Sequence, residues 1–402
     1  MGTPFPTSTG LAGLSPEERS RYARQLVLPQ VGPEGQARLK AGRVLVVGAG
    51  GLGSPAAMYL AAAGVGTIGL VDFDAVELSN LPRQLLYETA DAGRPKLEAA
   101  GERLRAINPH VTVLAHDERL DASNARALVR AYDVVADGTD NFPTRYLVND
   151  ACVLEKRPNV HASVLRFEGQ ASVFWAGRGP CYRCLHPAPP PAGAVPDCAE
   201  GGVLGVLPGL LGLIQATESI KILLSAGETL VGRLLMVDAL SMRFREIGLR
   251  RDPGCAVCGE KPTITDVVAT GDACAPAAAT GPARRGDIVQ PMPVGPGGAE
   301  ITVQELRDAR ERGEPIVLVD VREPFEWQIS DLPDSVKIPL ASLPSSLERL
   351  AREDDLVVYC RTGGRSGQAV AFLRGRGYPR VRNLVGGING WADAIDPSMA
   401  KY

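Results

Sequence analysis

The stretch Arg43-Val-Leu-Val-Val-Gly-Ala-Gly-Gly-Leu-Gly-Ser-Pro55 decides the fold class of this chain. Its apolar run favours a short strand, and the glycines of 48–53 predict a tight turn that opens a helix. Ser54 is expected to cap that helix and Pro55 suits its first turn. A glycine turn lets the backbone approach a phosphate, and the helix N-terminus favours the negative charge. The stretch therefore predicts a nucleotide site.

The surrounding sequence repeats the alternation of strand and helix. Apolar runs predict strands at 43–47, 65–71, 111–114 and 132–137, and a helix is expected at 95–107. This order predicts a Rossmann-like, mostly parallel sheet with helices on both faces. Ligands of such sheets lie beyond the carboxyl ends of the strands.

Residues downstream of the glycine turn bear on the choice of nucleotide. Asp72 ends the next strand, where a carboxylate can hold ribose hydroxyls, so the turn alone fits NAD, FAD or ATP. The run Ser79-Asn80-Leu81-Pro82-Arg83 and Lys96 add two cations and an amide. That charge exceeds the need of a pyrophosphate bridge in a dehydrogenase and suits a triphosphate under attack.

A polar run follows the strand expected at 132–137. Asp137-Gly-Thr-Asp140-Asn141 places carboxylates at a strand's carboxyl end. Oxygen ligands of this kind suit Mg²⁺, which these carboxylates could hold.

Four of the eight cysteines form two C-x-x-C pairs, Cys181/Cys184 and Cys255/Cys258. Four thiolates suffice for tetrahedral Zn²⁺, and the long gap between the pairs means that the metal would tie distant segments together. With every ligand supplied by the protein, this zinc would be structural. Cys198 differs, because it lies in a Pro-rich and Gly-rich loop where an inert cysteine is also compatible with the spacing.

The composition changes sharply after residue 268. Residues 269–297 are rich in Gly, Pro and Ala without apolar periodicity, and we expect a flexible linker there. Residues 298–402 return to an α/β pattern and predict a smaller second domain. We expect its helices at 303–312, 347–352 and 368–376 and its strands at 316–320 and 356–359.

The run Cys360-Arg-Thr-Gly-Gly-Arg365-Ser366 joins a strand to a helix in this second domain. Backbone N–H groups of the loop, the helix N-terminus and two arginines would stabilise a thiolate and an anionic group carried on its sulfur. Cysteine phosphatases use C-x₅-R, but Ser366 occupies the arginine position here. The shorter loop suits an added sulfur atom better than a phosphate.

We expect one domain over residues 1–268, and about residues 15–268 of it resemble the ubiquitin-activating-like adenylyltransferases of the MoeB/ThiF family, including the N-terminal run Arg21-Tyr-Ala-Arg24-Gln25. The resemblance implies a homodimer in which Arg24 reaches the phosphates of the neighbouring subunit, and it implies the same structural zinc. It also implies ATP contacts from Gly51, Asp72, Ser79, Asn80, Leu81, Pro82, Arg83, Lys96, Asp140, Asn141 and Arg24.

Residues 298–402, with Asp320-Val-Arg322 and the Gly-rich run 386–391, resemble a rhodanese domain. This implies that Cys360 carries a persulfide, with Asp320 and Arg322 as supports. In relatives that fuse both domains, a cysteine at the Cys198 position is an acyl-accepting or resolving nucleophile. The implied catalytic residues are Cys360, Cys198, Arg83 and Asp140, and Asp140 is also the implied ligand of Mg²⁺.

The combined resemblance implies one reaction sequence. ATP adenylates the C-terminal Gly-Gly carboxylate of a ubiquitin-like sulfur-carrier protein, and the Cys360 persulfide then delivers sulfur to give a thiocarboxylate. The sulfur donor would be thiosulfate or a cysteine desulfurase. Alternatively, the rhodanese domain serves a separate sulfurtransferase or phosphatase-like reaction. Two other functions are alternatives. A dehydrogenase would explain the glycine turn but would leave Arg83 and Lys96 unused. A non-catalytic scaffold that only binds the carrier protein would show no exchange of pyrophosphate into ATP.

Composition and net charge bear on the number of domains and on whether the protein binds nucleic acid or a membrane. The chain has 402 residues, a net charge of −3 and 45% hydrophobic residues, which fits two or three packed domains. This charge gives no electrostatic case for nucleic acid or an anionic membrane. The apolar run 203–214 is too short to span a bilayer and contains Pro208 and three glycines. We expect a cytoplasmic protein.

Overall fold

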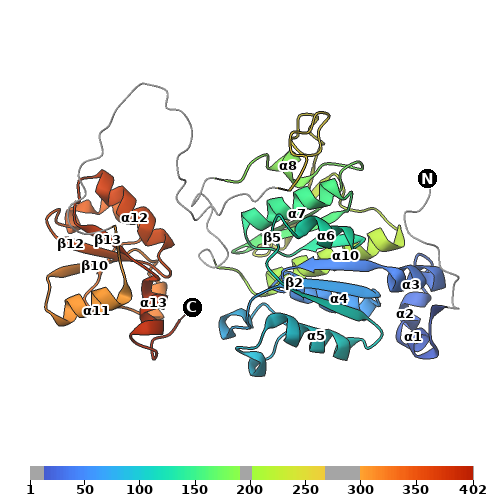
Figure 1. Ribbon diagram of the computed structural model, residues 1–402, viewed down its shortest axis with the longest axis horizontal. Coiled ribbons are helices and arrows are strands. Elements are labelled where there is room, and N and C mark those ends of the chain that lie inside the picture. The colour runs from blue at the N-terminus through green and yellow to red at the C-terminus, as the bar shows by residue number, and fades with distance from the viewer. Residues whose placement is uncertain (1–12, 191–201, 268–298, 402) are drawn as a thin grey trace. The chain divides into compact units, whose positions relative to one another are not determined.

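The computed structural model describes residues 13–190, 202–267 and 299–401. The chain divides into two compact units, Met1–Ala277 and Ala278–Tyr402 (Figure 1). The predicted linker at 269–297 and Cys198 lie outside the described residues. Each unit is described by itself.

The first unit is built on an eight-stranded sheet of order β3-β2-β1-β4-β5-β6-β7-β8. The pairs from β3 to β5 are parallel and those from β5 to β8 are antiparallel. The strands are β1 (Arg43–Val47), β2 (Thr67–Asp72), β3 (Thr112–Asp117), β4 (Val134–Asp137), β5 (Asn159–Leu165), β6 (Glu168–Phe174), β7 (Arg233–Asp238) and β8 (Arg243–Gly248). The expected mostly parallel α/β sheet is confirmed, with an antiparallel extension.

Helices cover both faces of this sheet (Figure 1). They are α1 (Pro16–Arg21), α2 (Ala23–Leu26), α3 (Gly32–Ala41), α4 (Gly53–Ala63), α5 (Lys96–Ile107), α6 (Ala125–Arg130), α7 (Phe142–Leu154), α8 (Tyr182–Leu185) and α10 (Val206–Leu224). Side chains of β1 alternate between the two cores. Val44 and Val46 join the core that contains α4, α5 and α10, whereas Leu45 and Val47 join the core that contains α6 and α7.

Helix α10 extends well beyond the apolar run noted in the sequence. Pro208 is the third residue of α10. It does not interrupt the helix, because the N–H groups of a helix's first turn have no intrahelical acceptor to lose. A Cβ on Gly212 would lie 2.4 Å from the carbonyl oxygen of Leu52, so this glycine lets α10 pack closely against the segment that leads into α4. Within the described part of the chain, α10 alone is long and apolar enough to cross a membrane, and 56% of its apolar window is buried in the protein. Such burial is typical of a core helix.

The second unit has a five-stranded parallel sheet of order β11-β10-β12-β13-β9. Its strands are β9 (Glu300–Ile301), β10 (Ile316–Asp320), β11 (Val336–Lys337), β12 (Asp355–Tyr359) and β13 (Val381–Leu384), and its α-helices are α11 (Val303–Glu311), α12 (Gly364–Gly375) and α13 (Gly387–Ala394).

The helix expected at 347–352 is wrong. The structure has only a 3₁₀ turn at Leu347–Arg349, after which Leu350 is extended. The hydroxyl of Tyr378 donates to the carbonyls of Leu347 and Leu350, which ties down this segment in its non-helical form.

Candidate functional site

The glycine turn between β1 and α4 is fixed by the end of β2. The Asp72 carboxylate accepts hydrogen bonds from the backbone N–H groups of Ala49 at 2.8 Å, Phe73 at 2.9 Å and Asp74 at 3.0 Å. A Cβ on Gly53 would lie 1.9 Å from the Gly48 carbonyl oxygen, so only glycine fits there. The Asp72 carboxylate therefore ties the turn to the end of β2, and Gly53 lets the turn close tightly on itself.

Two side chains that sequence reasoning assigned wrongly or missed also support this turn. Ser54 does not cap α4, since the helix begins at Gly53 and the Ser54 hydroxyl donates to the Ala49 carbonyl at 3.2 Å. The Tyr87 hydroxyl donates to the same carbonyl at 2.8 Å. Burial and the nearby Asp72 raise the pKa of Tyr87, so this phenol stays a donor.

The predicted cations lie beside the glycine turn. Lys96 begins α5, and its Nζ lies 2.8 Å from Asp74 and 3.8 Å from Asp72 with only 6% of its side chain exposed. The Arg83 guanidinium donates to the Ser79 carbonyl and to the Asn80 side chain. A Cβ on Gly51 would be 3.4 Å from Arg83 Cγ.

Leu81 and Pro82, which were also predicted to contact ATP, lie in the same segment as Arg83. Leu81 and Pro82 complete the short turn between Asn80 and Arg83. The Pro82 carbonyl oxygen would meet a Cβ on Gly205 at 2.5 Å, which brings the start of α10 close to this turn. The structure thus gathers the 79–83 run, Lys96 and Asp72 around the glycine turn.

The carboxylate that ends β4, Asp137, and the one in the turn that follows, Asp140, differ in what they can bind. Asp137 is fully buried and accepts from the Thr139 hydroxyl at 2.6 Å and from His161 Nδ1 at 2.8 Å. Burial alone would raise its pKa, but the bonds from His161 and Thr139 outweigh burial, and the pKa of Asp137 is lowered. Asp140 is exposed. Asn141 caps α7 by accepting from the Thr144 N–H at 3.0 Å. Only Asp140 therefore has a carboxylate open to a cation.

His161 is a site residue that sequence reasoning missed. It lies on β5 beside Asp137, is 1% exposed and packs against the rings of Phe174 and Tyr182. Its Nε2 atom is buried without a hydrogen-bond partner in the described structure. Because Arg145 also bonds the Thr139 carbonyl, the turn that carries Asp140 is held from two sides.

Arg24 lies exposed on the short helix α2. Exposed apolar residues follow it, with Val27 74% and Leu28 48% accessible. The structure therefore presents Arg24 on a surface rather than within a core.

The four predicted zinc ligands converge. Cys181, Cys184, Cys255 and Cys258 have their sulfur atoms within 4.8 Å of one another. Three of the sulfur separations are 3.9, 3.6 and 3.4 Å. Tetrahedral ligands about 2.3 Å from a zinc ion would be about 3.8 Å apart. The cluster therefore fits a metal of this size.

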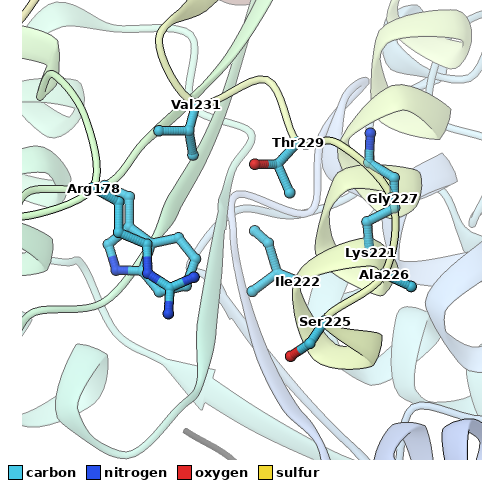
Figure 2. Close-up of a pocket in the computed structure, with 9 residues that line it drawn as sticks. Arg178, Lys221, Ile222, Ser225, Ala226, Gly227, Thr229 and Val231 are labelled. Carbon is cyan, nitrogen blue, oxygen red and sulfur yellow. The ribbon is translucent and has the colours of Figure 1, made fainter. Parts of the chain in front are cut away.

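A small cavity of about 230 Å³ lies near the C-terminal end of α10 (Figure 2). Arg178, Lys221, Ser225 and Thr229 are among its lining residues, and the Arg178 guanidinium stacks on Trp175 at 3.9 Å. None of the predicted site residues lines it.

In the second unit, Cys360 follows β12 and is 1% exposed. Its Sγ accepts hydrogen bonds from the Gly363 N–H at 3.1 Å and from the Ser366 hydroxyl at 3.3 Å. Gly363 has a φ of 108°, which favours glycine, and α12 begins at the next residue. The loop thus directs two donors at the sulfur, as an anionic thiolate or persulfide requires.

Two arginines near this loop are held by carboxylates. Arg322 and Asp320 are both fully buried and form an ion pair at 2.7 Å, as expected of structural supports. Arg365 forms a bidentate pair with Glu326 at 2.6 and 2.7 Å. Sequence reasoning missed Glu326.

Comparisons with known proteins agree with this geometry. The model of the ThiF family matches residues 22–257, and that of the rhodanese-like domain matches residues 302–394. The probable adenylyltransferase/sulfurtransferase MoeZ of Mycobacterium tuberculosis (strain ATCC 25618 / H37Rv) is 46% identical over 397 residues, covering 97% of both chains. Adenylyltransferase and sulfurtransferase MOCS3 of Sus scrofa is 45% identical over 414 residues, covering 97% of this chain and 89% of that one.

Solved structures resemble the first unit. A crystal structure of E. coli MccB with ATP has a TM-score of 0.53 and 23% identity, covering 59% of this chain and 74% of that chain. At this identity the likeness shows a shared fold.

Proposed function

This chain belongs to the ThiF family and carries a rhodanese-like domain, and on that premise we propose that both units act in one reaction sequence. The chain is an adenylyltransferase and sulfurtransferase. It adenylates the C-terminal Gly-Gly carboxylate of a ubiquitin-like sulfur-carrier protein and then converts it to a thiocarboxylate. The observation that carries this proposal is the presence, in one chain, of a cation-lined glycine turn and of a cysteine cradled by two donors.

The first unit supplies the groups for adenylation. The carrier's carboxylate is ionised at neutral pH and attacks the α-phosphate of ATP without a general base. Backbone N–H groups of the glycine turn, Arg83 and Lys96 offset the negative charge as pyrophosphate leaves. We propose that Arg24 adds to this charge from the second subunit of a homodimer, and that the protein works in the cytoplasm.

Asp140 is the residue proposed to hold Mg²⁺. Its carboxylate is exposed, whereas Asp137 already accepts bonds from Thr139 and His161, so Asp140 alone of the two suits a cation. Bound Mg²⁺ supplies charge that stabilises the leaving pyrophosphate. We propose a structural role for Zn²⁺ at the four cysteines, because all four positions of a tetrahedral ion would be filled by protein sulfur.

The second unit supplies the sulfur. The terminal sulfur of a Cys360 persulfide attacks the activated carbonyl carbon and displaces AMP, which gives an acyl disulfide. Cys198 then attacks the Cys360 sulfur and releases the thiocarboxylate, leaving a disulfide that a cellular thiol reduces. Alternatively, the Cys198 thiolate first attacks the acyl-adenylate and displaces AMP, and the Cys360 persulfide then attacks the resulting thioester and releases the Cys198 thiolate.

Carrier-dependent exchange of pyrophosphate into ATP tests the first step. Asp140→Ala is expected to abolish exchange, and Cys360→Ala to leave it intact. Glu34→Ala, which removes an exposed carboxylate on α3, is the matched control and should also leave exchange intact. Normal exchange by Asp140→Ala would contradict the proposed role of Asp140.

The trans action of Arg24 is tested by mixing inactive subunits. Arg24→Ala and Lys96→Ala damage different halves of a shared site if Arg24 reaches across. Co-refolded mixtures should then regain part of the exchange activity. No recovery in mixtures shown to be mixed dimers would place Arg24 outside the partner's site.

A further inference from the structure

One of the two arginines that follow Cys360, Arg365, is paired with a carboxylate, and this pair bears on which sulfur donor the loop accepts. Arg365 is the second residue of α12, five positions after Cys360. An uncompensated guanidinium at this place would attract an anionic donor. Its charge is instead balanced by the bidentate pair with Glu326, with 14% of the Arg365 side chain and 4% of the Glu326 side chain exposed.

Glu326 is itself held in place. Its carboxylate accepts from the Glu323 N–H at 2.8 Å, and its backbone carbonyl accepts from the buried Arg322 guanidinium at 3.4 Å. Arg322 in turn is paired with Asp320 at the end of β10. Since breaking a buried pair leaves an uncompensated charge, Glu326 and Arg365 are expected to stay paired when a donor enters.

The exposed surface next to the loop is apolar at two places. Phe325, which precedes Glu326, is 64% exposed. Val385 is 44% exposed and lies in the turn whose backbone faces Gly363. Neither side chain offers a charge to a small anion.

We propose that Glu326 is a specificity-determining residue, which by balancing Arg365 favours persulfide donors and disfavours the thiosulfate dianion. The inference rests on the proposed function of Cys360. In the favoured reaction, the Cys360 thiolate attacks the outer sulfur of R–S–SH, the S–S bond breaks, and R–S⁻ leaves as Cys360–S–SH forms. With thiosulfate the same attack releases sulfite, but the site must first accept a charge of −2.

Loading of Cys360 by thiosulfate and by cysteine persulfide, measured on the full chain as cyanide-releasable sulfur, tests this proposal. Glu326→Gln leaves the Arg365 charge without its carboxylate partner, and KM for thiosulfate should fall about tenfold. KM for cysteine persulfide should fall by less, about threefold at most, because that donor carries at most half the net charge of thiosulfate. Glu326→Gln/Arg365→Gln should lose the gain.

Two variants separate specificity from folding and from total charge. Glu326→Asp keeps the carboxylate and should retain the wild-type preference. Asp355→Asn removes the same charge from a pair with Arg382 at the opposite end of β12, and it should leave both KM values unchanged.

The outcomes are decisive. An unchanged thiosulfate KM in folded Glu326→Gln, an equal loss with both donors, or a wild type that prefers thiosulfate would overturn the proposal. If the wild type loads from neither donor, the proposed function of Cys360 fails instead.

Discussion

Replacing His161 by Leu tests whether the Asp140 turn depends on a buried hydrogen bond. Leu retains apolar contact with Phe174 and Tyr182 but cannot donate to Asp137, which is fully buried. A hydrogen bond to a charged group contributes about 1.5–3 kcal/mol. Since each 1.4 kcal/mol is a factor of ten, local opening of this region should become about 10- to 150-fold more frequent.

Hydrogen exchange measured by mass spectrometry gives the change in the frequency of local opening directly. Peptides that cover β4 and β5 should exchange faster in His161→Leu by that factor, whereas peptides of β10 and β12 in the second unit should not change. His161→Asn, whose amide can take the place of Nδ1–H, should restore part of the protection. Equal protection of β4 in wild type and His161→Leu would refute the argument that this bond holds the turn.

Three further predictions follow from other contacts. Gly53→Ala should abolish ATP binding measured by calorimetry, because the new Cβ would lie 1.9 Å from the Gly48 carbonyl oxygen. Gly209→Ala is the control and should bind ATP normally, because nothing lies within 4 Å of its Cβ position. Normal ATP binding by Gly53→Ala would contradict the proposed role of the glycine turn. Cys255→Ser should lower the zinc content of the purified protein and its unfolding temperature, and an unchanged zinc content would exclude the cysteine cluster as the zinc site. Two arginines lower the pKa of Glu155 to about 2, so its stabilisation is full above its ordinary value of 4.5 and is lost as pH falls toward 2. Glu155→Gln should therefore lower the unfolding free energy at pH 7 by about 1–2 kcal/mol, a figure reduced for solvent screening because both arginines are exposed by more than a third. The difference between the variant and the wild type should vanish near pH 2. A difference that persists at pH 2 would contradict the proposed charge interaction.

Local sequence signals predicted much of the fold. The apolar runs at β1 and β10 and the glycines at 48–53 carry their information within a few residues, so these elements were confirmed. The segment 347–352 shows the limit of such signals. The helix predicted there was wrong because the hydrogen bonds that hold this segment come from the Tyr378 hydroxyl, which is far along the chain.

The candidate site divides in the same way. The four cysteines were found because their type and spacing are informative, and the structure brings them together. His161 and Glu326 were missed because their partners, Asp137 and Arg365, are 24 and 39 residues away. Such pairs depend on strand register and on loop packing, which no local pattern encodes.

The most direct test of the central account follows one sulfur atom. The protein is incubated with ATP, a Gly-Gly-ended carrier and cysteine persulfide labelled with ³⁴S in its outer sulfur, and the carrier is weighed. We predict a carrier that has exchanged one carboxylate oxygen for ³⁴S, only when ATP is present and only with Cys360 intact. Labelled carrier formed by Cys360→Ala, or adenylated carrier that never gains sulfur from a loaded wild type, would contradict the account.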